Sequence, residues 1–325
     1  MSPRFQKGVL IYNPFSGRGN HRLDEIQSVA DHLRPLVGKL TLDTTRSAGS
    51  GGPQAREAIA NGCDLVLACG GDGTMFEVLQ GVAGSQVTFG VLPFGTANVL
   101  AADLELSQDL GRAARQLVNY VPRRISLGRI SYDGGAHKRY FTVAAGVGVH
   151  AELVYNANSQ AKRAAGFAAY YVSGFRLLFK HRFVPFEIEV TQPDGTVHFG
   201  AAMELVGMRV RSFGRWLRRW RPGSALDAPY LQLVVLRESS RIAMVKYVFG
   251  AVAGTANNVT SRADVSFMPC VKVRCTPIET AQPNGSGSGD IIRSQADGEM
   301  LGVMPVELEI VPDALTLLMP PAKQR

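Results

Sequence analysis

The hydrophobic and polar positions of the first 120 residues alternate between two periods. Short apolar runs bounded by turn residues predict buried strands. These strands are expected at Gly8–Tyr12, Leu40–Asp43, Asp64–Cys69 and Thr88–Leu92. Apolar residues that share one helical face predict helices between and after them, at Leu23–Leu33, Pro53–Ala60, Met75–Val82 and Gln108–Val118. This β-α-β-α order predicts a Rossmann-like three-layer α/β domain, with helices on both faces of a parallel sheet.

After about residue 122 the pattern changes to strands separated by turns. The expected strands are Ile125–Tyr132, Tyr140–Val149, Val184–Thr191, Val197–Val210, Leu231–Leu236, Ala263–Cys275 and Val306–Ile310. Pro193–Gly195 is a hairpin signal. Helical patches are expected at Lys162–Phe179 and Ser239–Gly250, and a flexible loop at Asn284–Asp290. We therefore predict two domains, residues 1–122 and 123–325, of which the second is an antiparallel β-sandwich.

The composition narrows the class of protein. Of the 325 residues, 46% are hydrophobic and 19% are charged, which is enough apolar mass for real cores. No apolar run approaches the roughly 20 residues that span a bilayer, and the short run after the polar N-terminus is strand-sized rather than a signal peptide. The four cysteines show no C-x-x-C spacing, which disfavours a zinc site and favours a cytoplasmic chain with reduced thiols.

The formal net charge of +8 indicates an anionic partner. Between Leu153 and Leu226 eleven basic residues oppose four acidic ones, so +7 of that charge lies in one quarter of the chain. Within Arg209–Arg221, which holds both tryptophans, the spacing fits an amphipathic segment that lies on an anionic membrane. Its candidate lipid-facing residues are Arg215, Trp216, Arg218, Arg219 and Trp220.

Other interpretations of this basic region stay open. Arg209–Arg221 is equally consistent with a strand end and loop that have a solvated basic face and core aromatics. The aromatic and basic segment Lys162–Phe183 could line an acyl-chain entrance, although a core-facing helix is favoured. Nucleic acid is not expected as a partner, because the chain contains no nucleic-acid motif.

The sharpest chemical signal is the sequence GGDGT, which directly follows the DLVLAC strand and precedes a helix. Glycines at such a turn let the backbone approach a phosphate closely, and the helix N-terminus presents N–H groups to it. Asp72 brings a carboxylate to the same place, where it could meet a metal-bridged phosphate. The candidate phosphate contacts of this loop are Gly70, Gly71, Asp72, Gly73 and Thr74.

Two further turns follow strands of the same sheet, so all three are expected at its carboxyl edge, where ligands bind in such folds. They are Asn13–Gly17 and Leu92–Asn98. Their candidate nucleotide contacts are Asn13, Ser16, Gly95, Thr96 and Asn98. The chain lacks the P-loop, the G-x-G-x-x-G fingerprint after its first strand, and the H-R-D and D-F-G kinase elements.

In these motifs the whole chain resembles the diacylglycerol kinase catalytic-domain family, which includes sphingosine and ceramide kinases. NPFSG, Thr45, GGDGT, PFGTANVLA, FTVAAGVG and Asp297-Gly298-Glu299 occur in the family's order. The resemblance implies a nucleotide-binding domain, a lipid-substrate domain and transfer of the γ-phosphate of ATP to a lipid hydroxyl, with diacylglycerol favoured. It also implies Mg²⁺, a cytoplasmic enzyme peripheral at the inner membrane face, and the possibility of a homodimer.

The resemblance further assigns roles to residues. Asn13, Thr45, the GGDGT loop and Thr96 would contact ATP, and Asp72 would act near the phosphates and Mg²⁺. Glu299 would be the general base that takes the proton of the lipid hydroxyl, since such a hydroxyl needs a base at hydrogen-bond distance. Without the resemblance, a carboxylate after Gly298 in a turn is more typical of a solvated loop.

The chain departs from the family at an acidic run that can hold a structural Mg²⁺ in bacterial members. Only Asp227 of that run is present, because Ala228, Pro229 and Gln232 stand at the neighbouring positions, and His150 replaces a frequent Asp. Three alternatives stay open: a sphingoid-base or ceramide kinase, an ATP- and membrane-binding homologue whose catalysis weakened with the loss of this run, and an NAD kinase. The last shares GGDGT but is disfavoured by the DGE and PFGTANVLA motifs.

Overall fold

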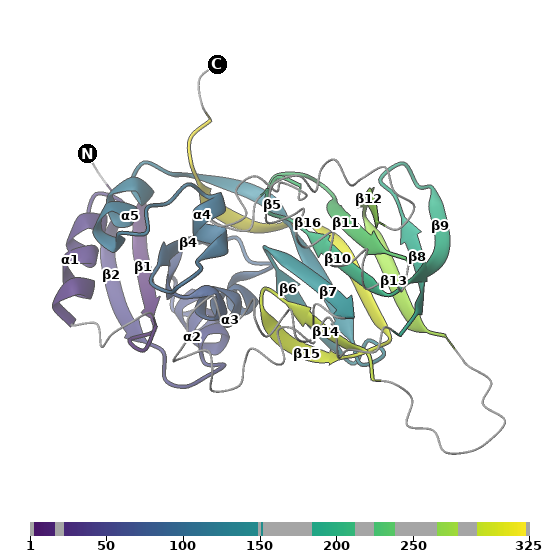
Figure 1. Ribbon diagram of the computed structural model, residues 1–325. Helices are drawn as coiled ribbons and strands as arrows, with labels where there is room; N and C mark the ends of the chain where they lie inside the picture. Colours follow the sequence, from purple (N-terminus) through teal and green to yellow (C-terminus); the bar gives the residue numbers. More distant parts are fainter. Residues whose placement is uncertain are drawn as a thin grey trace. The chain divides into compact units, whose positions relative to one another are not determined.

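The computed structural model describes residues 3–16, 23–148, 151, 184–211, 224–237, 265–278 and 291–322 (Figure 1). The chain divides into two compact units. The first contains Met1–Leu127 and Val311–Arg325, and the second contains Gly128–Ile310. The C-terminal segment thus joins the first unit, whereas the boundary at residue 122 assigned it to the second. The reason is a strand pairing between segments far apart in sequence, which periodicity does not reveal.

The first unit is a parallel sheet with strand order β2-β1-β3-β4-β16. Its strands are β1 (Phe5–Tyr12), β2 (Val37–Thr44), β3 (Leu65–Gly70), β4 (Thr88–Pro93) and the last part of β16 (Val306–Met319). Every residue of β3 and β4 is buried, as expected for strands that are covered on both faces. Thr316 and Leu317 of β16 pair with Thr88 and Phe89 of β4, which places the C-terminal strand in this sheet.

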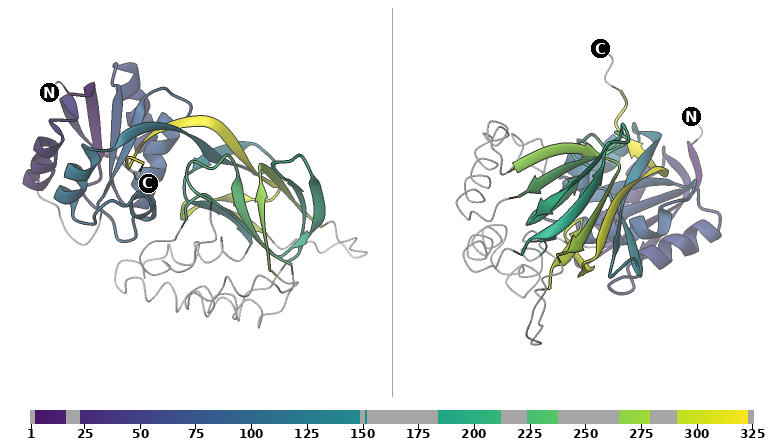
Figure 2. Two further views of the ribbon diagram at one scale, coloured as in Figure 1. Left: turned by 90° about the horizontal axis from the view of Figure 1, so that it is seen from above. Right: turned by 90° about the vertical axis from the view of Figure 1, so that its right-hand side faces the viewer.

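The helices in the described part of this unit are α1 (Leu23–Leu33), α2 (Gly51–Ala60), α3 (Asp72–Val82), α4 (Val99–Asp103) and α5 (Leu110–Leu117). Four of them lie in two pairs. Helix α1 packs beside α5 and α2 beside α3, and the two pairs cover opposite faces of the sheet (Figures 1 and 2). The predicted three-layer α/β fold is confirmed. Helix α4 was not predicted, because five residues are too short for a periodic pattern.

The second unit consists of two sheets whose strands pair antiparallel. The first part of β16 belongs to one sheet, together with the last part of β5 (Val121–Tyr132) and the whole of β6 (His137–Phe141), β8 (Phe186–Thr191), β9 (Val197–Ala202) and β13 (Lys272–Pro277). The other sheet contains β7 (Ala144–Gly148), β10 (Glu204–Met208), β11 (Leu231–Leu236), β12 (Val265–Cys270), β14 (Arg293–Ala296) and β15 (Glu299–Val303). A Cβ added to Gly207 of β10 would lie 3.4 Å from Leu308 of β16, so the sheets face each other, and the predicted β-sandwich is confirmed.

Three of the predicted strands are each two strands that lie in different sheets. Strand β6 is followed by β7 after Thr142 and Val143, β9 by β10 after Met203, and β12 by β13 after Val271. The apolar run is continuous through each corner. The sequence pattern therefore predicts one long strand where the structure has two. The β14–β15 hairpin was also missed, although its Asp-Gly turn is a strong signal for a two-residue hairpin loop.

Several expectations concern residues outside the described ranges. These are the helical patches at 162–179 and 239–250, the loop at 284–290, and the lipid-facing candidates at 215–220. All four cysteines lie in the described part of the chain and are buried free thiols. Among the described residues, no helix is both long and apolar enough to cross a membrane.

Candidate active site

Three loops meet at the carboxyl edge of the parallel sheet in the first unit. They follow β1, β3 and β4, which are neighbours in the strand order. Backbone pairing continues beyond the strand ends: the N–H of Asn13 donates to the carbonyl of Cys69 at 3.0 Å, and the N–H of Phe94 donates to the carbonyl of Gly70 at 2.8 Å. The sheet therefore brings the two predicted turns and GGDGT to one place, as the motif positions predicted.

The closest approach of the loops is between two glycines. A Cβ on Gly95 would lie 2.4 Å from the Cα of Gly71 and 2.8 Å from Oδ1 of Asn98, closer than real Cβ contacts. A side chain at position 95 would therefore push the third loop away from GGDGT. This contact explains why glycine is needed at position 95, independently of any ligand.

Polar side chains of the first loop lie on the GGDGT turn. Nδ2 of Asn13 donates to Oγ1 of Thr74 at 3.4 Å, and the N–H of Gly71 donates to Oγ of Ser16 at 3.3 Å. Helix α3 begins at Asp72, so the N–H groups of its first turn have no partners within the helix and lie at the positive end of its dipole. The turn is therefore built to face an anion.

The carboxylate of Asp72 connects GGDGT to the third loop. Its Oδ2 accepts from the N–H of Asn98 at 2.9 Å, and its Oδ1 accepts from the N–H of Val99 at 2.7 Å. Desolvation raises the pKa of Asp72, and the amide hydrogen bonds oppose that rise. Each carboxylate oxygen has a second lone pair, so the group can still meet another ligand. Asp72 thus fixes the start of α4 in addition to any role near phosphates.

The side chain of Asn98, a predicted nucleotide contact, is buried within its own loop. Asn98 is 1% exposed and adopts a left-handed conformation with φ of 50°. Its Oδ1 accepts from the N–H of Gly95, and its Nδ2 donates to the carbonyl of Gly95 and to Oε1 of Gln108. Asn98 therefore closes its own loop, while Thr96 at the tip of that loop is exposed.

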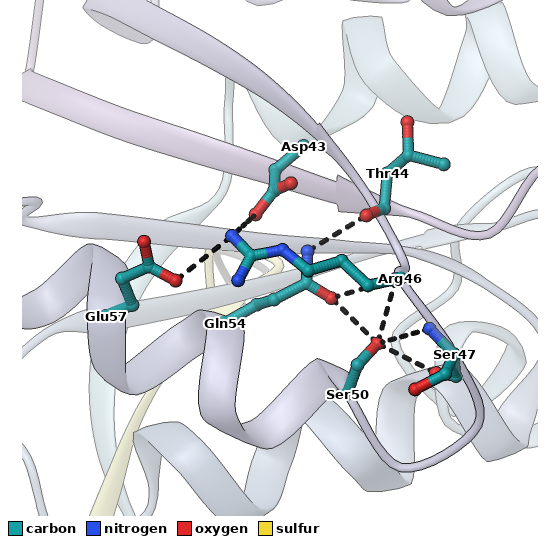
Figure 3. A network of polar contacts seen from close by, with 7 residues as sticks. All are labelled: Asp43, Thr44, Arg46, Ser47, Ser50, Gln54 and Glu57. Carbon is teal, nitrogen blue, oxygen red and sulfur yellow. Dashed lines mark hydrogen bonds and ion pairs between the residues drawn. The ribbon is translucent and has the colours of Figure 1, made fainter.

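Thr45 lies in the loop between β2 and α2, and its N–H donates to the carbonyl of Tyr12 at 2.9 Å. Figure 3 shows how this loop is held: Oγ of Ser50 accepts from the N–H groups of Arg46 and Ser47, at 3.0 and 3.1 Å. Nε2 of Gln54 reaches back to the carbonyl of Thr44 at 2.9 Å (Figure 3). The Arg46 guanidinium pairs with Asp43 and Glu57 across the same network.

Glu77 of α3 holds the other side of this loop. Its Oε1 accepts from the N–H of Gly49 at 2.8 Å, and its Oε2 accepts from the N–H of Gly51 at 3.2 Å. The helix that follows GGDGT therefore also positions the Thr45 loop. Gln54 and Glu77 were missed, because the sequence alone does not distinguish a polar residue that holds a loop from one on a solvated helix surface.

In the second unit, Asp297 and Gly298 form the turn between β14 and β15, with positive φ of 49° and 84°. The Asp297 carboxylate accepts from the N–H groups of Thr142, Val143 and Ala144 at 2.8–3.0 Å, and from Oγ1 of Thr142 at 3.2 Å. Desolvation raises the pKa of Asp297 to about 6, against the opposing effect of these donors. The turn is therefore anchored to the β6–β7 corner, unlike a solvated loop.

Glu299 is the first residue of β15 and is half-buried. It pairs with Ala296 in the hairpin register, so the anchored turn fixes its backbone. Its role as a general base stays a prediction. Asp227, the doubtful candidate ligand of a structural metal ion, is exposed. His150 lies outside the described residues. Within the described ranges, no group of three or more His, Cys, Asp or Glu side chains could hold a metal ion.

One part of the membrane interpretation needs correction. Arg209, the first residue of the predicted amphipathic segment, is 0% exposed. Its guanidinium lies inside the second unit and donates to backbone carbonyls there. Arg209 is therefore not part of a solvated or lipid-facing basic surface. The remaining lipid-facing candidates, residues 215–220, lie outside the described ranges.

Comparisons with known proteins agree with this architecture. Residues 7–130 match the diacylglycerol kinase catalytic domain, and residues 141–319 match the YegS C-terminal NAD kinase beta sandwich-like domain. The chain belongs to the diacylglycerol kinase catalytic-domain family. It is therefore a lipid kinase by family, as the resemblance predicted.

Relatives of this kinase family align along most of the chain. A protein of Bacillus subtilis (strain 168) named diacylglycerol kinase is 28% identical over 321 residues, 98% of each chain. A protein of the same name from Staphylococcus aureus (strain MRSA252) is 27% identical over 237 residues, 72% of each chain. The crystal structure of a diacylglycerol kinase from Bacillus anthracis str. Sterne has a TM-score of 0.72 at 20% identity, covering 98% of this chain and 99% of that one. This last likeness confirms the fold.

Proposed function

We propose that this lipid kinase uses ATP and Mg²⁺ to phosphorylate diacylglycerol, giving phosphatidic acid. The observation that carries the proposal is the interlocked loop set at the carboxyl edge of the first unit's sheet. There Gly95 lies so close to Gly71 that position 95 has no room for a side chain, and α3 begins with its N–H groups at the turn. The full-length similarity to a protein named diacylglycerol kinase supports the choice of acceptor.

The residues present fit a nucleotide phosphate. The GGDGT backbone and the N-terminus of the eleven-residue helix α3 would hold the phosphates, with Ser16 and Thr96 as hydroxyl donors. Mg²⁺ bound with ATP would neutralise phosphate charge, and such ions are usually held by one or two carboxylates plus the phosphates. Asp72 is the carboxylate that would serve, while it keeps the third loop in place.

On this proposal Glu299 takes the proton of the acceptor hydroxyl, and the hydroxyl oxygen attacks the γ-phosphorus of ATP. The bond from that phosphorus to the bridging oxygen breaks, and ADP leaves. A positioned general base contributes about 10²- to 10⁴-fold to a rate. The Asp297 turn supports this role, because it fixes the backbone from which Glu299 projects. Asp297 would act as a positioning residue and Glu299 as a catalytic residue.

The test is transfer of labelled γ-phosphate from ATP to diacylglycerol in mixed micelles. We expect Glu299→Gln to lower kcat by about 10²-fold or more with an unchanged Tm, because Gln keeps the shape but accepts no proton. Asp72→Ala should abolish transfer. Glu187→Gln is the matched control, since Glu187 is exposed on β8 and should tolerate the change. Full activity of both Glu299→Gln and Asp72→Ala would refute these roles.

The acceptor is decided by offering a panel of lipid alcohols in the same assay. Diacylglycerol is expected to be preferred over a sphingoid base and ceramide. ATP binding and liposome binding without turnover on any acceptor would instead favour the non-catalytic homologue. Phosphorylation of NAD would favour the NAD kinase alternative.

We also propose that the enzyme is cytoplasmic and binds the inner membrane face through residues 211–221. The concentration of charge in this quarter of the sequence supports this, with Arg209 now excluded from the binding surface. Binding to anionic liposomes should weaken with added salt and with Arg218→Ala plus Arg219→Ala. Binding that ignores both changes would contradict the proposal. Whether the enzyme forms a homodimer is a separate prediction, which sedimentation would test.

A further inference from the structure

The largest fully buried side chain of the described residues is a cation. Arg209 directly follows β10 and is 0% exposed. Its Nη1 donates to the carbonyl oxygens of Ala228 at 2.6 Å and Tyr230 at 3.1 Å, and its Nη2 donates to the carbonyl oxygen of Leu226. Burial lowers the pKa of Arg209 to about 10, so the group is still charged at neutral pH.

The three carbonyls belong to one short turn, 226–230, through which the chain enters β11. The turn is tightened by a hydrogen bond from the N–H of Ala228 to the carbonyl of Ala225 at 2.9 Å. The hydroxyl of Ser224 lies 3.3 Å from the carbonyl of Met208 and 3.2 Å from that of Tyr230. Several backbone acceptors that converge on one point require hydrogen-bond donors or a cation, because unsatisfied buried carbonyls are destabilising.

Backbone carbonyls are also ligands that a hard divalent cation accepts, and the run at which this chain departs from the family can hold a structural Mg²⁺ in bacterial members. The residues present do not fit that ion. The guanidinium already occupies the three carbonyls, and a divalent cation beside it would be repelled. Asp227, the one carboxylate of the run, is exposed. The neighbouring side chains of Ala228, Pro229 and Gln232 supply no negative charge.

We propose that the Arg209 guanidinium takes the place of a structural metal ion, and that the turn 226–230 is therefore independent of metal in this chain. Arg209 is itself held in place, because its backbone N–H donates to the carbonyl of Val143 at 2.8 Å. The cation that organises the turn is thus covalently attached to the end of β10 and cannot be removed by a chelator. Any Mg²⁺ requirement of the enzyme would then arise with the nucleotide, whichever lipid is phosphorylated.

The first test uses the unmodified full-length protein without nucleotide. Thermal unfolding is measured in excess EDTA and in millimolar MgCl₂, for the wild type and for Asp227→Asn. The expected result is one Tm in both solutions for both proteins. A wild-type Tm that falls by several degrees in EDTA, is restored by Mg²⁺, and loses this response in Asp227→Asn would overturn the proposal.

The second test replaces the internal cation. Arg209→Ala should lower Tm by several degrees, and millimolar methylguanidinium should restore part of that loss by entering the vacated space. Leu205→Ala is the matched control, because Leu205 is a fully buried residue of the adjoining strand whose loss leaves an apolar cavity. It should be destabilised but not rescued. Equal rescue of both variants, or a wild-type Tm for Arg209→Ala, would overturn the proposal. If Arg209→Ala does not fold, the chelator measurement on the wild type decides alone.

Discussion

The second unit contains two desolvated charged groups of opposite sign, and each binds backbone groups at the end of a strand. Asp297 is an anion that accepts from three consecutive N–H groups at the β6–β7 corner. Arg209 is a cation that donates to three carbonyls of the turn before β11. Val143 links them, since its N–H donates to Asp297 and its carbonyl accepts from the N–H of Arg209.

The difference between these two regions lies in what surrounds them in sequence. Asp297 precedes a glycine, and Asp-Gly is a turn signal that points to a local structural role. Arg209 lies among six arginines, which as a group indicate a surface. Charge density along the chain therefore misassigned Arg209, whose guanidinium donates to backbone carbonyls. A charged cluster in sequence need not be one cluster in the fold.

The largest expected effect is on the free energy of unfolding, and it tests whether Arg209 and Arg211, which both follow β10, contribute differently to stability. Arg209→Met should lower the free energy of unfolding by about 3 to 5 kcal/mol, because three carbonyls lose their donors. Arg211→Met, two residues further along at an exposed position, should change it by less than about 0.5 kcal/mol. Urea unfolding of both variants measures this. Similar losses for the two would remove the distinction between an internal and a surface arginine.

The next effect compares two Asp-Gly turns. Asp297 and Asp133 both have positive φ, but the Asp133 carboxylate accepts from one backbone N–H, that of Val303, instead of three. Asp297→Ala should therefore destabilise the protein by about 3 kcal/mol and Asp133→Ala by about 1 kcal/mol. Since both variants place alanine in the left-handed region, backbone strain largely cancels between them. Equal losses would mean that the extra donors contribute nothing measurable.

The raised pKa of Asp297 predicts a pH dependence. The pKa of Asp297 is about 6 in the folded protein, against an ordinary value of 3.8. Between these two pH values the folded protein therefore holds a proton that the unfolded chain has lost. The stability from this group is present at low pH and is lost as the pH rises through about 6. Relative to the non-titrating Asp297→Asn, the wild type should lose roughly 2 kcal/mol between about pH 4.5 and about pH 7.5. A difference between the two that is constant with pH would contradict the raised pKa.

Much of the fold could be predicted because its elements carry local patterns. The four strands β1 to β4 and the helices between them follow from periodicity, and their order implies the parallel sheet. The pairing of β16 with β4 could not be predicted, because it joins residues more than 200 positions apart and no local sequence pattern indicates which distant strands pair. The sheet-switching corners were missed for a related reason: a bend at Met203 or Val271 does not interrupt an apolar run.

The candidate site was predictable in its location more than in its contacts. GGDGT and the turns after β1 and β4 do meet, because parallel strands bring their carboxyl ends to one edge. The sequence could not show that Asn98 uses its side chain to close its own loop. That contact depends on the left-handed backbone of Asn98. Nor could the sequence show that Asp72 binds the amides of Asn98 and Val99, since this depends on where a loop 26 residues away lies.

The smallest effect isolates a single donor of the Asp297 cluster. Thr142→Val keeps the backbone N–H that donates to Asp297 and the β-branched shape, but removes Oγ1 at 3.2 Å from the carboxylate. Because one hydrogen bond to a charged group is lost and no backbone group is left without a partner, we expect a loss of about 1 kcal/mol. The loss should vanish when Asp297→Ala is already present, which a double-mutant cycle measures. If Thr142→Val still costs about 1 kcal/mol in the Asp297→Ala background, the loss comes from the packing of Thr142. The Asp297 carboxylate would then be stabilised by the backbone N–H donors alone.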